Sequence, residues 1–313
     1  MRAVRFDRQG VAVADLSGPA GEGVLVDVRA AGICGSDLAF IAAGGQRWVP
    51  GHEIAGVTEH GDAVAVQPNW PCGTCKLCDQ GRSHLCAQSM GRFLGVNNLD
   101  GGFAQQVRVD PSLLRPIPAG MDWAVACMAE PLAVALHAMT KLDPQPLEPV
   151  LVLGAGTIGL LSSAFLVQRG HPVRLLARHP VQQNLAAEFG ALPVTGEELA
   201  DSSYLHILDT AGSQSAIDVA YSAAAPTCRI VSVGCGGWSV STSVVMVEKE
   251  LSLEGSIIYT RGEFEAAIAW LDSNAAQAAR LITHRFSLEE APEAFRVAAD
   301  KSASGSIKVV LEP

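Results

Sequence analysis

The sequence predicts an α/β protein with two domains, one β-rich and one built on a doubly wound parallel sheet. Its 313 residues suit two domains of about 100–200 residues each. Short apolar runs separated by Gly, Pro and Asp fill the first third of the chain, whereas strand-like and helix-like segments alternate beyond it. Hydrophobic residues make up 49% of the chain and charged residues 17%, so there is enough apolar material for two buried cores.

Residues 1–130 are expected to form the β-rich domain. Strand-like runs at Val24–Val28 and Ala63–Val66 lie between turn-forming residues. The stretch Pro68–Val96 has no sustained hydrophobic period, so we expect a loop that something other than a hydrophobic core holds in place. Residues 253–313 are assigned to the same domain. Their expected elements are two amphipathic helices and a closing strand, at Phe264–Leu271, Ala291–Ala299 and Ile307–Leu311.

Residues 131–252 are expected to form the domain with the parallel sheet. After an apolar helix at Ala133–Met139, a buried strand at Val150–Leu153 leads through a glycine-rich turn into a helix at Ile158–Gln168. The alternation of strand and helix then continues, which is typical of a doubly wound sheet. The later elements are expected at Val173–Ala177, Val181–Phe189, Leu205–Leu208 and Arg229–Val233.

Net charge and the N-terminal segment indicate which partners and which cell compartment to expect. The formal net charge is −10, which argues against binding to nucleic acid or to an anionic membrane, since both require a basic face. The N-terminus has no apolar segment of a signal peptide, so a cytoplasmic location is expected. The uncharged stretch Val150–Val167 approaches the length of a membrane span, but its three glycines favour a buried nucleotide-binding unit.

Four of the eight cysteines lie in one short loop. Cys72, Cys75 and Cys78 are separated by two residues each, and Cys86 follows eight positions later. Four thiolates at this spacing can surround one zinc ion and leave no coordination position open, so the site is predicted to be structural. Disulfides are disfavoured in a long chain without a secretion signal, and an iron–sulfur cluster is the competing interpretation.

A second set of metal-binding residue types lies outside this loop. Cys34, His52, Glu53 and Glu130 offer a thiolate, an imidazole and carboxylates. Three such ligands leave a fourth position for water or substrate, as a catalytic zinc site requires. Taken singly, each residue is weak evidence, because a lone buried cysteine is usually a core residue and a lone histidine is usually a hydrogen-bonded polar group.

The glycine-rich turn predicts a dinucleotide site. Gly154, Gly156 and Gly159 follow a strand and open a helix, with Thr157 and Ile158 between them. In such a motif the glycines allow a tight turn, close approach of the backbone to a pyrophosphate, and close packing of helix on strand. The helix N-terminus then faces the phosphates.

The end of the next strand predicts which cofactor is preferred. An acidic residue usually stands there, about 20 residues beyond the glycines, and binds the ribose 2′-hydroxyl of NAD. This chain has Ala177 instead, followed by Arg178 and His179. Because no carboxylate repels a 2′-phosphate and a guanidinium can pair with one, we expect NADP(H) to be preferred over NAD(H).

These motifs together resemble those of the medium-chain zinc-dependent alcohol dehydrogenases, and in particular the sorbitol and threonine dehydrogenase branch. The resemblance covers essentially the whole chain and implies a GroES-like β-rich catalytic domain plus a Rossmann doubly wound cofactor domain. The matching motifs are Gly-Ile-Cys-Gly-Ser-Asp at 32–37, Gly-His-Glu at 51–53, the Cys72–Cys86 loop, Glu-Pro-Leu-Ala at 130–133 and the glycine motif at 154–159.

The resemblance also implies residue roles. Cys34 and His52 are expected to bind a catalytic zinc ion with either Glu53 or Glu130 as the third ligand, the other carboxylate lying close by or bridging through water. The role of orienting His52 is assigned to Asp37. Ser36 is expected to hydrogen-bond the alcohol oxygen at the zinc and to carry its proton away. The last implied assignment is Lys308, near the cofactor pyrophosphate.

The implied reaction is hydride transfer between a secondary alcohol or its ketone and the nicotinamide. A polyol, an amino-alcohol or a cyclic alcohol is the expected small-molecule substrate, and the expected assembly is a homodimer or homotetramer. One departure from the family keeps other reactions open, because Leu38-Ala39-Phe40 stands where a histidine usually completes a proton relay. The alternatives are a reductase of a conjugated alkene or iminium, a non-catalytic cofactor-binding homologue, and a zinc-free enoyl or quinone reductase. The last ranks lowest, since such proteins generally lack the Cys34/His52 pair.

Overall fold

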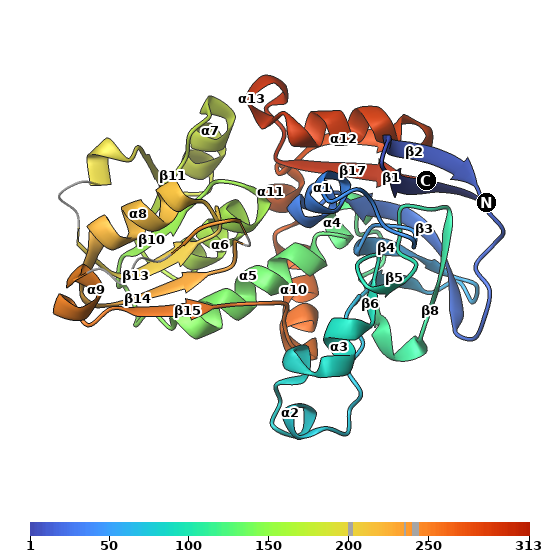
Figure 1. Ribbon diagram of the computed structural model, residues 1–313, viewed down its shortest axis with the longest axis horizontal. Coiled ribbons are helices and arrows are strands. Elements are labelled where there is room, and N and C mark those ends of the chain that lie inside the picture. The colour runs from blue at the N-terminus through green and yellow to red at the C-terminus, as the bar shows by residue number, and fades with distance from the viewer. Residues whose placement is uncertain (200–202, 235, 240–243) are drawn as a thin grey trace. The chain divides into compact units, whose positions relative to one another are not determined.

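The computed structural model describes residues 1–199, 203–234, 236–239 and 244–313, so Cys235 lies outside the described residues. The chain forms two compact units (Figure 1), Met1–Ala133 with Thr260–Pro313, and Val134–Tyr259. These boundaries fall a few residues beyond the expected ones at 130/131 and 252/253. Both predicted architectures are present, a β-rich unit and a unit with a parallel sheet.

The first unit is built on a seven-stranded sheet in the described part of the chain, with the order β16-β17-β3-β4-β5-β9 and β8 also paired with β3. The parallel pair β16 and β17 comes from the C-terminal segment, so β17 joins the end of the chain to β3 near its beginning. The strands are β1 (Arg2–Asp7), β2 (Gly10–Asp15), β3 (Val24–Gly32), β4 (Glu53–Thr58), β5 (Ala63–Val66), β6 (Phe93–Leu94), β7 (Asn98–Leu99), β8 (Gln106–Val109), β9 (Leu114–Pro116), β16 (Ile282–Ser287) and β17 (Lys308–Glu312).

Helices pack on this sheet, and short helices also lie within the segment that was expected to be a loop. The region from Pro68 to Val96, which we expected to be a loop, contains three short helical turns and the two-residue strand β6. Phe103 and Phe295 pack edge-to-face at 5.5 Å in the core, which the apolar side of α12 closes. The helices are α1 (Gly35–Ala42), α2 (Lys76–Asp79), η1 (Ser83–Leu85), α3 (Ala87–Gly91), η2 (Pro111–Leu113), α4 (Trp123–Ala126), α10 (Arg261–Ser273), α11 (Ala275–Ala279), η4 (Leu288–Glu290), α12 (Ala291–Ala299) and α13 (Lys301–Ser304), and α5 (Ala129–Leu142) crosses the unit boundary.

The second unit contains a six-stranded parallel sheet among its described residues, in the order β12-β11-β10-β13-β14-β15. This is the strand order of a doubly wound dinucleotide-binding fold, in which ligands bind beyond the carboxyl ends of the strands. Its elements are β10 (Val150–Leu153), α6 (Thr157–Gln168), β11 (Val173–Leu176), α7 (Pro180–Glu188), β12 (Leu192–Val194), η3 (Glu197–Leu199), β13 (Tyr204–Asp209), α8 (Gln214–Ala223), β14 (Ala224–Ser232), α9 (Val244–Glu248) and β15 (Ser252–Gly255).

One helical stretch, Trp123–Leu142, is long and apolar enough to cross a membrane by length and composition. Its most apolar window is 78% buried inside the protein, as in a core helix. The stretch Val150–Val167, which approaches the length of a span in the sequence, is divided into β10, a turn and α6.

The glycine motif brings α6 close to the end of β10. Gly154 has a φ of +100°, a conformation that side chains with a Cβ atom rarely adopt. A Cβ atom at Gly159 would overlap the carbonyl oxygen of Gly154. The close packing that the motif predicts for its last glycine is therefore present.

We expect Gly159→Ala to lower the free energy of unfolding by about 1–3 kcal/mol, because the added methyl group meets rigid backbone. Urea denaturation followed by circular dichroism measures this change. The control is Gly196→Ala in the same unit, where a Cβ atom meets nothing within 4 Å. Equal stability of the two variants would show that the turn and helix can separate without cost.

Candidate functional site

The register of two strands gathers the first group of predicted site residues. Gly32, at the end of β3, lies opposite Glu53, at the start of β4. Cys34 follows β3 and precedes the first residue of α1, while His52 directly precedes β4. Cys34 and His52, which are 18 positions apart in the sequence, are thereby adjacent in the structure. The ligand atoms of Cys34, His52 and Glu53 all lie within 4.8 Å of one another.

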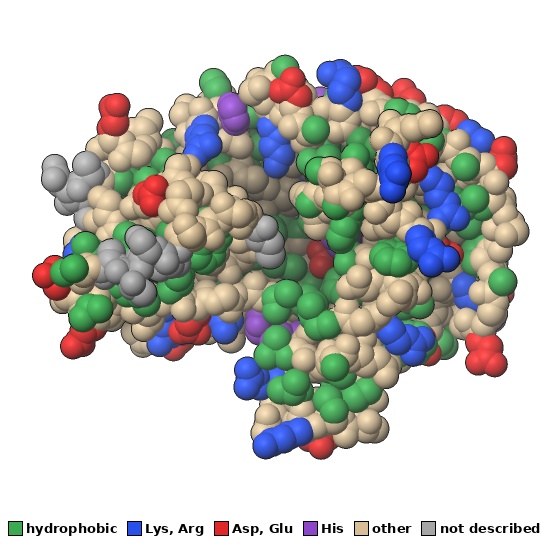
Figure 2. All heavy atoms as spheres, in the orientation of Figure 1, with side chains coloured by type: hydrophobic (Ala, Val, Ile, Leu, Met, Phe, Trp, Pro, Cys, Tyr) green, Lys and Arg blue, Asp and Glu red, His purple; other side chains and the backbone are tan. Residues whose placement is uncertain are grey.

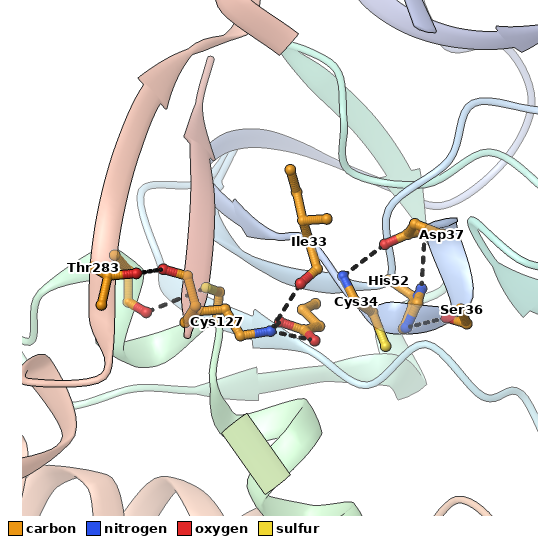
Figure 3. A network of polar contacts seen from close by, with 10 residues as sticks. Ile33, Cys34, Ser36, Asp37, His52, Cys127 and Thr283 are labelled. Carbon is orange, nitrogen blue, oxygen red and sulfur yellow. Dashed lines mark hydrogen bonds and ion pairs between the residues drawn. The ribbon is translucent and has the colours of Figure 1, made fainter. Parts of the chain in front are cut away.

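The imidazole of His52 has a different neighbour on each nitrogen (Figure 3). Its Nε2 atom is 3.5 Å from the hydroxyl oxygen of Ser36. On the opposite side, Nδ1 is 3.7 Å from Asp37 Oδ1, which is an ion-pair distance and too long for a hydrogen bond. Nε2 and the Cys34 sulfur therefore lie on the same side of the site, with Asp37 behind the ring.

Burial controls the protonation of this group. The Asp37 side chain is fully buried, which raises the pKa of its carboxyl to about 6. Its Oδ2 atom accepts a 2.9 Å hydrogen bond from the backbone N–H of Cys34, so the first turn of α1 holds it in place. Burial disfavours the charged form of His52, but Asp37, Cys34 and Glu130 together hold its pKa well above the usual value.

Lys308, which the resemblance places near the cofactor pyrophosphate, forms a buried ion pair with Glu53. Its side chain is 2% exposed, and Nζ donates hydrogen bonds to both carboxylate oxygens of Glu53 at 2.8 and 2.6 Å. It also donates to the carbonyl oxygen of Ile33 at 3.1 Å. Although burial opposes the charge of Lys308, the Glu53 carboxylate raises the pKa of the ammonium. The ammonium is therefore held by Glu53 and Ile33 within its own unit, and its expected place near the cofactor pyrophosphate stays a prediction.

Three further residues surround this centre. Glu130, in the first turn of α5, is 5% exposed, and its charge raises the pKa of His52. The ring of Phe93 lies edge-on to His52, with centroids 6.0 Å apart. Burial raises the pKa of the Cys127 thiol, which donates to the carbonyl oxygen of Ala124. Phe93 and Cys127 were not predicted, because nothing in the local sequence distinguishes them from core residues.

The four loop cysteines converge without forming disulfides. The Sγ–Sγ distances are 3.9 Å for Cys72–Cys78, 3.6 Å for Cys75–Cys78 and 3.5 Å for Cys72–Cys86. A tetrahedron with zinc–sulfur bonds of about 2.3 Å has sulfur–sulfur edges of about 3.8 Å. The arrangement therefore fits one tetrahedral metal ion. In Figure 2, side chains of the hydrophobic class, which includes cysteine, lie among basic and other side chains on the lobe that carries α2 and α3.

The donor set around Cys34 also fits a dication. Among the described residues, Asp37 Oδ1 and His52 Nδ1 are buried and have no hydrogen-bond partner. Lys308 neutralises one carboxylate, but Asp37, Glu130 and the Cys34 thiol also lie near His52. Buried groups of one sign require compensation. A metal ion between the sulfur and Nε2 would supply it, and the carboxylate of Glu53 is within reach.

In the second unit, the glycine motif lies at the carboxyl end of the central strand. Gly156 immediately precedes α6, with extended backbone, and Thr157 and Ile158 form the first turn of that helix. The first backbone N–H groups of a helix have no partner within it and are available to a phosphate. Figure 1 shows α6 following β10, as this arrangement requires.

The neighbouring strand ends at the residues that predict cofactor choice. Ala177 is buried, Arg178 is exposed and His179 directly precedes α7. The Nη2 atom of Arg178 donates a 2.8 Å hydrogen bond to the hydroxyl oxygen of Ser215 in α8. Among the described residues, no carboxylate lies within ion-pair distance of Arg178. Ser215 was not predicted, because it lies 37 residues further along the chain.

Comparison with known proteins agrees with this architecture. Residues 20–119 match the model of the alcohol dehydrogenase GroES-like domain. The chain is 29% identical to L-idonate 5-dehydrogenase (NAD(P)(+)) of Escherichia coli K12 over 92% of each protein. It is 26% identical to sorbitol dehydrogenase of Bacillus subtilis 168, over 87% of this chain and 85% of the relative.

The solved structures show the same fold. Alcohol dehydrogenase TADH from Thermus sp. ATN1 superimposes with a TM-score of 0.90 at 27% identity, and all of each chain is covered. The β-rich unit is thus GroES-like and the parallel-sheet unit is a Rossmann domain. These similarities support the medium-chain zinc alcohol dehydrogenase family, in its sorbitol dehydrogenase-like branch, and an NAD(P)-dependent oxidoreductase of alcohols and ketones.

Proposed function

We propose that this chain is a zinc-dependent enzyme that transfers hydride between a secondary alcohol or its ketone and a nicotinamide cofactor, with NADP(H) preferred over NAD(H). The observation that carries the proposal is the approach of three ligand atoms, from Cys34, His52 and Glu53, to within 4.8 Å of one another. A thiolate, an imidazole and a carboxylate bind zinc while leaving a position for substrate.

Glu53 is our choice for the third ligand. Its carboxylate oxygen meets the distance criterion with Cys34 and His52. Glu53 also pairs with Lys308, and a carboxylate has enough lone pairs to bind an ammonium and a metal ion together. Glu130 acts electrostatically on His52, so it would be the carboxylate that lies close to the ion or bridges to it through water.

Ser36 and Asp37 would support the reaction from α1. When bound, zinc lowers the pKa of the substrate hydroxyl, and the nicotinamide takes up the hydride. The Ser36 hydroxyl, 3.5 Å from His52 Nε2, is near enough to hydrogen-bond the substrate oxygen and accept its proton. Asp37 holds the opposite nitrogen of His52 and thereby orients the ring.

The cofactor would bind to the second unit. Gly154, Gly156 and Gly159 would receive the pyrophosphate at the start of α6, and Arg178 and His179 the adenosine ribose. The absence of a carboxylate at Ala177 supports NADP(H), as does the exposed guanidinium of Arg178. L-idonate 5-dehydrogenase, whose name gives NAD(P)(+), agrees with a branch in which either cofactor is used.

A polyol is the substrate class that the comparisons favour. Two relatives are named for idonate and sorbitol, which both carry several hydroxyl groups.

We also propose that Cys72, Cys75, Cys78 and Cys86 bind a second, structural zinc ion, because their sulfur–sulfur distances suit one. A cytoplasmic location and a homodimer or homotetramer stay predictions from the sequence.

Cys34→Ala should lose one of two zinc ions and all measurable activity while the fold survives. The thiolate is one of three proposed ligands and contributes little to the core. Zinc content by mass spectrometry, together with oxidation of secondary alcohols, measures the effect. Cys228→Ala, which removes a buried cysteine of the other unit, is the matched control. Full activity of Cys34→Ala would show that the site is assigned wrongly.

Cys75→Ala is expected to release the other zinc ion and to promote aggregation rather than to stop the chemistry selectively. The region it belongs to contains only short helical turns, so a metal ion would contribute much of its stability. Thermal unfolding and zinc content measure this outcome. A variant with unchanged stability and a metal-free loop would contradict the structural role.

The ratio of kcat/KM for NADPH to that for NADH should exceed one, and Arg178→Ala should lower it by about 10–100-fold. A hydrogen bond to a charged group contributes roughly 1.5–3 kcal/mol, which corresponds to that range. Arg169→Ala, which removes an exposed arginine of the same unit that contacts Phe165, is the control. A clear preference of the unchanged enzyme for NADH would refute the assignment.

A further inference from the structure

The contact between Arg178 and Ser215 joins two turns of the Rossmann sheet. Arg178 follows β11 and Ser215 lies in the first turn of α8, just after β13. In the strand order, β10 lies between β11 and β13. The 2.8 Å hydrogen bond therefore spans the carboxyl end of β10, where the glycine motif begins. Ligands of doubly wound sheets bind at this edge.

A chain of hydrogen bonds ends at the Ser215 hydroxyl. Ser213, the residue that precedes α8, accepts from the backbone N–H of Ala216, and its oxygen is 3.1 Å from the oxygen of Ser215. Either hydroxyl can donate in the Ser213–Ser215 contact, and since Ala216 uses one lone pair of Ser213, we take Ser213 as the donor. The two lone pairs of Ser215 then accept from Ser213 and from Arg178. The Ser215 proton is left to donate to a group outside this chain of bonds.

The surroundings of Ser215 favour an anion as the acceptor of its proton. Arg178 and Ser215 are exposed, and no carboxylate lies within ion-pair distance of Arg178 in the described part of the chain. The acids nearest in sequence are engaged, because Asp218 accepts from Gln214, and Asp209 accepts from Ser232 and two backbone N–H groups. The first turn of the ten-residue helix α8 adds a positive dipole end.

We infer that Ser215, fixed by Ser213 and Arg178, is a specificity-determining residue that donates a hydrogen bond to the ribose 2′-phosphate of NADP(H). The inference rests on the NADP(H) preference proposed above and extends it from the end of β11 to the β13–α8 turn. Arg178 would contact the phosphate from one side, and Ser215 from the other. The ribose hydroxyl of NAD(H) offers no negative charge to this pair, so discrimination should depend on both residues.

The test is calorimetric binding of 2′,5′-ADP and of 5′-AMP to the full chain, with circular dichroism to verify folding. Ser215→Ala should bind 2′,5′-ADP about tenfold more weakly and 5′-AMP unchanged, since one hydrogen bond to a charged group is lost. Ser215→Thr keeps the hydroxyl and should retain the affinity, whereas Ser215→Asp should lose more than Ser215→Ala. Ser273→Ala, on α10, is the control and should change nothing.

Two outcomes separate this inference from the proposed function. If Arg178→Ala weakens 2′,5′-ADP binding and Ser215→Ala does not, the role of Ser215 is refuted and the NADP(H) preference stands. If the unchanged chain binds both nucleotides equally, the preference itself is wrong and the inference fails with it. Inorganic phosphate is the third probe. Binding of phosphate that depends on Ser215, with equal binding of the two nucleotides, would assign the pair to free phosphate and also overturn the inference.

Discussion

A buried ion pair connects the last strand, β17, with β4 inside the first unit. Lys308 of β17 and Glu53 of β4 are 2% and 1% exposed, and the ammonium also binds the carbonyl oxygen of Ile33, which follows β3. Three strands from opposite ends of the chain therefore meet at one lysine. Removing one partner of a buried pair typically costs about 3–5 kcal/mol, because a charge is left uncompensated. Strand β17 consequently contributes a side chain that contacts the candidate metal ligand Glu53.

The same ion pair leaves a charge imbalance that a metal ion would correct. Lys308 balances Glu53, but Asp37 and Glu130 are also buried, and the Cys34 thiolate would add a further negative charge. The charges of Asp37, Cys34 and Glu130 raise the pKa of His52 against the effect of its burial, whereas burial itself raises the pKa of the Asp37 carboxyl to about 6. A dication would release His52 to bind in its neutral form. Metal binding and the protonation of this unit are thus coupled.

Local patterns were predictable from the sequence, whereas pairings over long separations were not. Two predicted features each lie within fewer than twenty residues of sequence, and the structure contains both. They are the cluster of Cys72, Cys75, Cys78 and Cys86 and the glycine motif at 154–159 that precedes α6. Lys308 lies 255 residues from Glu53 and 275 from Ile33, so its partners depend on strand order. A lysine in a closing strand is usually solvated, and no local signal distinguishes one that is buried.

Proton transfer is one step in which this chain is expected to depart from its relatives, because Leu38-Ala39-Phe40 on α1 stands where a histidine usually completes a proton relay. Ser36 and Asp37 lie at the start of the helix and face the site, whereas Leu38, Phe40 and Ile41 pack against the hydrophobic core. Beyond Ser36 and Asp37, α1 carries no titratable side chain, so we expect a proton accepted by Ser36 to leave through water or through a group outside this helix. The rate of alcohol oxidation would then depend on how readily the proton leaves the Ser36 hydroxyl.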